Sequence, residues 1–155
     1  MTKNEMIDRL NGDLSNELKH MLFYLYHASL VRGLHREEIR ELLLEEASSE
    51  MKHVQEFQDL IIGLGGTPTM KPNSFDTFSD PHMILKYALD MEDEVVFNYS
   101  QRMLETEQLA LTPGCGADAK WIEVFLEDQM LHSRTDADNM RQMVESFGAT
   151  GHVKF

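Results

Sequence analysis

Four long stretches with helical hydrophobic spacing, separated by three breaks of unequal length, restrict the fold of this chain more than any other feature. The stretches cover residues 2–31, 35–64, 81–111 and 117–147. Glycine or proline stands at each break, where helices end most readily. No Val- and Ile-rich alternating run of the kind that forms a β-strand is present. The sequence therefore predicts an all-α fold.

The lengths of the breaks predict how the helices are connected. The first and third breaks are short, so each should join two antiparallel neighbours into a hairpin. The second, residues 67–80, is long enough to run the length of a bundle, and Asp80-Pro81 then supplies a capping side chain and a first-turn proline. We expect a four-helix bundle of two antiparallel hairpins joined by one long crossover. It would occupy residues 1–148 and leave residues 149–155 as a short C-terminal tail.

Charge and cysteine content narrow the functional classes. The formal net charge of -13 repels phosphate backbones, which argues against a nucleic-acid partner. No segment reaches the run of about 18 apolar residues that spans a bilayer, and the polar residues after Met1 do not form a signal peptide. The single cysteine, Cys115, cannot form an internal disulfide. We expect a cytoplasmic protein with neither a membrane nor a nucleic-acid partner.

Polar side chains interrupt the apolar stripes near the middle of the helices. In the second helix the core-facing positions are apolar at both ends and become Glu46, Glu50 and His53 between them. Glu17 flanks the stripe of the first helix, and Glu92 lies within that of the third. In an antiparallel bundle these mid-helix positions can meet at one level. Because buried carboxylates are unfavourable unless they are paired or bound to metal, the pattern predicts a metal pair inside the bundle.

The fourth helix has two candidate registers. One turns Gln129, His132 and Asp136 toward the core, and the other, through Glu127, would turn a mostly charged face inward. The first register is therefore the expected one. It adds an amide and an imidazole, those of Gln129 and His132, to the carboxylates of the other helices.

These residues resemble the motifs of the ferritin-like proteins, and of bacterioferritin most closely, over nearly the whole chain. Glu50-Met51-Lys52-His53 is similar to the family's E-x-x-H motif, and Tyr99 follows Glu92 by seven residues, as in that family. Leu126-x-Asp128-Gln129-x-x-His132 stands where the family has L-x-D-E-x-x-H. The resemblance implies a ferritin-like four-helix bundle that binds two iron ions per subunit, with manganese as the alternative metal.

The resemblance also implies roles for individual residues. The metal ligands carried over from the family are Glu17, Glu50, His53, Glu92, Gln129 and His132. In that pattern Glu17 and Glu92 are terminal ligands and Glu50 is a bridge. Gln129 stands in place of a second bridging Glu, so the site has one negative charge fewer out of four. One metal position would then be weak or would hold a metal other than iron, and Gln129 is either a ligand or a hydrogen-bonding neighbour of the ligands.

Four further residues have roles that the sequence leaves open. Tyr24 either hydrogen-bonds a ligand carboxylate or takes a catalytic role as a one-electron donor. His20 is a flanking residue or an additional ligand that offsets Gln129, and Asp136 orients an imidazole or is exposed. Met51 matches the haem-ligating methionine of bacterioferritins, which implies a haem b shared by two subunits.

The resemblance implies oxidation of Fe(II) by O2 or peroxide, with iron storage if the subunits assemble into a shell. The segment after Gly148 is short, so we expect the fifth helix of bacterioferritin to be missing or vestigial and the protein to form a dimer or another small homo-oligomer. Removal of peroxide by an iron or manganese pair without storage is an alternative. A DNA-protecting mini-ferritin is disfavoured, since its metals lie between subunits and this chain is acidic. The last hypothesis is a structural bundle with an impaired site.

Overall fold

The computed structural model describes residues 1–150, with side chains through residue 145. It contains four helices: α1 (Lys3–Leu30), α2 (Arg36–Gly63), α3 (Pro81–Ala110) and α4 (Gly116–Thr150). No strand occurs in residues 1–150, so the predicted all-α class is confirmed. The helix ends lie within one residue of the predicted ends, except that α4 continues through Gly148 to Thr150. The rest of the predicted tail, residues 151–155, lies outside the described part of the chain.

Side chains near the helix ends explain where the helices begin. Thr2 Oγ1 accepts a hydrogen bond from the Glu5 backbone N–H at 3.1 Å, and Asp80 Oδ2 accepts one from the Met83 N–H at 3.0 Å. These bonds satisfy amides that have no partner within α1 or α3. Gly33, between α1 and α2, has a φ of 114°, a conformation that other residues adopt only at a cost. The first interhelical turn therefore depends on this glycine.

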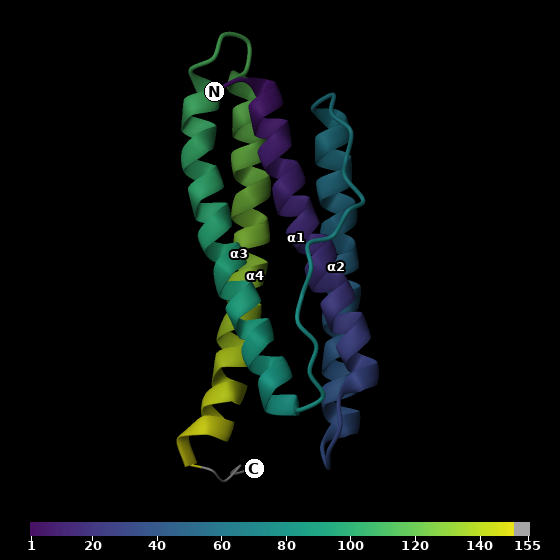
Figure 1. Ribbon diagram of the computed structural model, residues 1–155. Helices are drawn as coiled ribbons and strands as arrows, with labels where there is room; N and C mark the ends of the chain where they lie inside the picture. The colour runs from purple at the N-terminus through teal and green to yellow at the C-terminus, as the bar shows by residue number, and fades with distance from the viewer. Residues whose placement is uncertain (151–155) are drawn as a thin grey trace.

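The two hairpins and the long crossover of the prediction are confirmed. Figure 1 shows α1 beside α2 and α3 beside α4, with the α2–α3 connection running along the outside of the bundle from one end to the other. Hydrogen bonds hold this connection against α1. The Asn73 N–H donates to the Ser15 carbonyl at 3.2 Å, and the Phe78 N–H donates to His27 Nε2 at 3.1 Å. No helix within residues 1–150 is long and apolar enough to cross a membrane.

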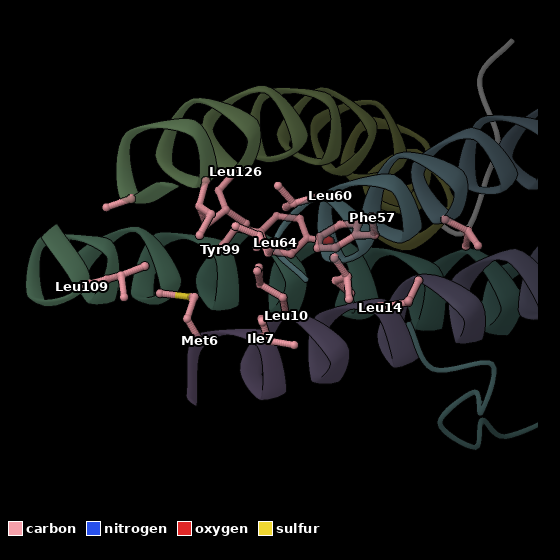
Figure 2. Packing of buried hydrophobic residues seen from close by; sticks show 14 of the residues in the cluster. Met6, Ile7, Leu10, Leu14, Phe57, Leu60, Leu64, Tyr99, Leu109 and Leu126 are labelled. Atoms are coloured by element: carbon pink, nitrogen blue, oxygen red, sulfur yellow. The ribbon is translucent and has the colours of Figure 1, made fainter. Parts of the chain in front are cut away.

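Two apolar clusters fill the two halves of the bundle. The first, shown in Figure 2, includes Leu10, Phe57, Tyr99 and Leu126. The second includes Phe23, Leu43, Ile84 and Met140. Each cluster draws on all four helices, and the burial of its side chains drives their association. Along α1, α2 and α3, the Glu and His residues singled out from the sequence lie between the two clusters, in a centre shielded from bulk water at both ends.

Candidate metal centre

The polar centre is built from one face of each of α1, α2 and α3. Glu17 and His20 are three residues apart on α1, and Glu50 and His53 are three apart on α2, so each pair projects from one side of its helix. Glu92 faces them from α3. All five side chains are buried, and the three carboxylate residues are 0% exposed. The structure therefore brings four of the six predicted ligands together, along with His20.

Glu50 links two overlapping groups of ligand atoms. In one, His53 Nδ1 lies 3.3 Å from Glu50 Oε2 and 3.7 Å from Glu17 Oε2. In the other, His20 Nδ1 lies 3.4 Å from Glu92 Oε1 and 3.9 Å from Glu50 Oε1. The ligand atoms of each group lie within 4.8 Å of one another, a spacing that one cation could occupy. The centre thus offers two cation positions with Glu50 shared between them.

Two buried tyrosines orient the outer carboxylates. The Tyr24 hydroxyl donates to Glu92 Oε1 at 2.8 Å, and the Tyr99 hydroxyl donates to Glu17 Oε1. Such hydrogen bonds fix the direction in which a carboxylate presents its second oxygen. Of the two roles left open for Tyr24, the structure shows the hydrogen bond to a carboxylate.

Several polar atoms of the centre are buried without a hydrogen-bond partner. They are Glu17 Oε2, Glu50 Oε1, Glu92 Oε2 and both ring nitrogens of His20. A buried polar atom left unpaired costs about 1–3 kcal/mol. Carboxylate and imidazole are also donor types that suit iron and manganese. The residues of this centre therefore fit a pair of such ions.

The pKa values in the centre diverge because its groups are buried and close together. Burial raises the pKa of Glu50 well above its usual value, and the neighbouring Glu17 raises it further. Burial also acts on Glu17, but interactions with Glu50 and His53 outweigh it and lower the Glu17 pKa to about 2. In the metal-free centre the raised pKa favours a proton on Glu50. A bound metal would take the place of that proton, because carboxylate ligands bind in the ionised form.

A third group of ligand atoms extends the centre toward the second apolar cluster. Glu46, Glu50, Glu92 and Asp136 have carboxylate oxygens within 4.8 Å of one another, and Glu46 and Asp136 are half-buried. Asp136 is therefore half-buried rather than exposed. Burial and Glu92 raise its pKa while the imidazoles of His53 and His132 act to lower it, so its expected role beside an imidazole stays a prediction. Glu46 was not a predicted ligand, and its core-facing register was the only signal that pointed to it.

The predicted register of α4 is confirmed for Gln129, which is buried while Glu127 of the rejected register is exposed, but it is wrong for His132. The buried positions of α4 among the described side chains are Ala119, Ile122, Leu126, Gln129, Ser133, Ala137 and Met140. The small side chains at positions 133 and 137 face inward, which turns His132 to the rim. The His132 side chain is 59% exposed, with Nε2 at 3.9 Å from Asp128 Oδ1. Its ring centre lies 5.7 Å from that of His53, but His132 joins none of the three ligand groups found among the described residues.

Gln129 is buried, but its side chain is hydrogen-bonded to a residue outside the ligand groups. Its Nε2 donates to Glu56 Oε2 at 2.9 Å, and it too belongs to none of the ligand groups within residues 1–145. Glu56 lies six residues beyond Glu50 on α2, away from Glu46. The geometry therefore favours the hydrogen-bonding role for Gln129 over the role of a metal ligand.

Restoring the family's glutamate at this position should destabilise the metal-free protein. In Q129E a second carboxylate would meet Glu56 in place of an amide donor, so we expect a loss of about 1–3 kcal/mol at neutral pH. Denaturant unfolding would measure it. The double variant E56Q/Q129E, which exchanges the two groups, should recover most of the loss. Unchanged or higher stability of Q129E alone would contradict the expected repulsion.

Stability of the metal-free protein should fall as the pH rises from about 5 to 8. Burial, with help from Asp136 and Glu92, raises the pKa of Glu46 from 4.5 to about 8. The folded state then binds more protons than the unfolded state in this interval, so the free energy of unfolding decreases with pH. The lowered pKa of Glu17 acts in the opposite direction, but only below about pH 4.5. Denaturant unfolding of chelator-treated protein at several pH values should show a shallower slope for E46Q, and an equal slope would contradict this origin.

Met51, the predicted haem ligand, lies apart from the centre. Its side chain is 61% exposed on α2. A haem bound to this sulfur could be shielded from water only between this subunit and another molecule. Haem binding at Met51 would therefore depend on how subunits assemble and not on the interior of the bundle.

A helical bundle with buried Glu and His side chains spaced for two cations is characteristic of the di-metal carboxylate proteins. Residues 7–110, more than half of the chain, match the family profile of the Ferritin-like domain. The chain therefore belongs to the ferritin-like domain family. The matched region begins at Ile7, within α1, and ends with α3 at Ala110, so α4 lies outside it.

A solved structure supports the same assignment. The chain is similar to a ferritin-like, diiron-carboxylate protein from Bacillus anthracis str. Ames, with a TM-score of 0.80 and 27% sequence identity over 92% of this chain and 96% of that one. None of the curated protein sequences compared with the chain matches it significantly.

Proposed function

We propose that this protein binds two iron ions at the buried centre and oxidises Fe(II) with O2 or peroxide. The observation that carries the proposal is the position of Glu50 between two carboxylate–imidazole groups, each with its outer carboxylate held by a tyrosine. Iron as the metal is supported by the similar structure, which is that of a diiron-carboxylate protein.

The residues of the centre would hold the metals and control their surroundings. Glu17 and His53 would bind one ion and Glu92 the other, with Glu50 shared. Tyr99 and Tyr24 would keep the outer carboxylates in place, and Tyr24 is also the candidate one-electron donor because its hydroxyl lies 2.8 Å from Glu92. Iron supplies the redox chemistry when it is bound. The two apolar clusters exclude bulk water from both ends.

The reaction balances with either oxidant. Two Fe(II) ions give two electrons to O2, which takes up two protons and leaves as hydrogen peroxide. With peroxide as the oxidant, the two electrons and two protons break the O–O bond and give two water molecules. In both cases two Fe(III) ions result, and storage of iron would follow only if the subunits form a shell.

A second candidate function is peroxide removal without storage, in which two peroxide molecules give O2 and two water molecules. The observation that favours it is the third ligand group, because the added carboxylates of Glu46 and Asp136 suit Mn(II) as well as Fe(II). The resemblance to bacterioferritin supports the first candidate, Fe(II) oxidation. A haem bound at Met51 would be part of that same proposal. Partners in either case are the metal, the oxidant and further copies of the chain, and the net charge of -13 disfavours DNA.

Anaerobic loading with two Fe(II) per chain, followed by O2 or peroxide, tests the proposal. Near-ultraviolet absorbance should report rapid oxidation, with two Fe(II) consumed for each O2 or peroxide. E17Q, which removes a ligand of the first position, should slow it strongly. Continuous peroxide consumption with no net iron oxidised would favour the second candidate. A protein that binds neither iron nor manganese would refute both.

A further inference from the structure

The fourth helix approaches the centre through Asp136, which lies seven residues, or about two turns, beyond Gln129. Asp136 has a carboxylate oxygen within 4.8 Å of ligand oxygens from Glu46, Glu50 and Glu92. Gln129 instead donates to Glu56. The α4 group that meets the ligands thus lies toward the second apolar cluster, away from the place where the family motif would put it.

The carboxylates at this position have little positive charge near them. Within 4.0 Å, the ion-pair partners of Glu46, Glu50, Glu92 and Asp136 among the described residues are His20 and His53 alone. Four carboxylates this close, in a largely buried place, repel one another unless protons or a cation intervene. An acidic cluster alone does not establish a binding site, so the neighbouring imidazole is decisive.

His20 is an independent indication of a ligand at this place. It is only 1% exposed, and neither of its ring nitrogens has a hydrogen-bond partner. Its Nδ1 faces Glu92 Oε1 at 3.4 Å and Glu50 Oε1 at 3.9 Å. A buried imidazole normally satisfies at least one nitrogen, and metal coordination is a common way to do so. His20 therefore faces Glu50 and Glu92, the two carboxylates that its ligand group shares with the group of Glu46 and Asp136.

We propose that the second metal position is formed by His20, Glu46, Glu92 and Asp136 together with the shared Glu50, and that Gln129 and His132 are not ligands. This inference rests on the proposed function, since it concerns where the second metal of that centre is bound. Glu46 and Asp136 supply two negative charges where the family's bridging glutamate would supply one. The loss of charge at Gln129 is thereby offset.

The two positions would differ in chemistry. The first has Glu17, Glu50 and His53 in one ligand group. The second, as assigned here, would draw on one imidazole and four carboxylates from two ligand groups that share Glu50 and Glu92. An oxygen-rich donor set suits hard divalent ions, so the second position should take Mn(II) readily. The first position depends on Glu17, and the second does not.

Metal content of single variants tests the assignment. Purified full-length protein is loaded anaerobically with Fe(II), or with Mn(II), desalted, and analysed for metal per chain by mass spectrometry. We expect about two ions in the parent, one in D136N, one in E17Q and none in the double variant E17Q/D136N. H132A should retain two, as should E45Q, a substitution at an exposed position next to Glu46. Circular dichroism would verify that each variant is folded.

Anomalous scattering from Mn(II)-soaked crystals of the parent gives a second measurement that needs no variant. A peak between the carboxylates of Glu92 and Asp136 and within bonding distance of His20 is the expected result. Two ions in D136N with only one in H132A, or a peak beside Gln129 and His132, would overturn the assignment while leaving the proposed function intact. A parent protein without bound metal would overturn the proposed function and this inference with it.

Discussion

Replacing Glu50 by Gln is expected to abolish metal binding at both positions, so that the metal content falls from about two ions per chain to near zero. Glu50 belongs to all three ligand groups of the centre, and its carboxylate is fully buried between them. Loss of residues that merely support a metal ligand typically weakens binding about 10–100-fold. The loss of a shared ligand should exceed that range at each position.

The substitution should remove the metals without unfolding the bundle. Burial disfavours the ionised form of Glu50 and so raises its pKa, and an uncharged amide of the same size removes that cost of burial in the metal-free protein. We expect metal-free E50Q to be at least as stable as the metal-free parent in denaturant unfolding. E45Q is the matched control, because Glu45 lies on the same helix with an exposed side chain. Two bound ions in E50Q would exclude Glu50 as the shared ligand.

Metal binding should also raise the melting temperature of the parent by about 5–10 °C. A ligand present at about 100 times its dissociation constant stabilises the folded state by about 2.7 kcal/mol. Each kcal/mol raises the melting temperature of a domain of this size by about 2–4 °C. The effect should be large here because the buried oxygens and nitrogens that lack hydrogen-bond partners would acquire one in the metal.

Calorimetry of chelator-treated protein, with and without added Mn(II), measures this shift without oxidising the metal. E50Q should show almost no shift under the same conditions, which separates binding at the centre from binding to the acidic surface. Q129E, by contrast, should melt earlier than the parent when metal-free. Equal melting temperatures of the parent with and without Mn(II) would mean that the centre is structural.

The sequence by itself determined the four helices and their connections. Capping residues such as Thr2 and Asp80 bind amides only three residues away, and apolar spacing is a property of one helix. Both signals can therefore be recognised in a short stretch of sequence. The crossover of residues 67–80 followed from its length alone. The shared level of Glu17, Glu50, His53 and Glu92 also followed, because each lies near the middle of its helix. Glu50, His53 and Glu92 interrupt an apolar stripe there, and Glu17 flanks one.

Only the tertiary structure decided which side chains of the core-facing side of α4 reach the metal centre. Registers through His132 and through Ser133 differ by one residue, about 100° around the helix axis, and α4 has apolar side chains that suit either. The packing of Ser133 and Ala137 against the neighbouring helices settles the choice and sends His132 outward. Asp136 and Gln129 were both predicted to face the core, and the structure adds that they meet different partners, Glu46 and Glu56. Contacts between helices fix this rotation, and spacing within a single helix does not record them.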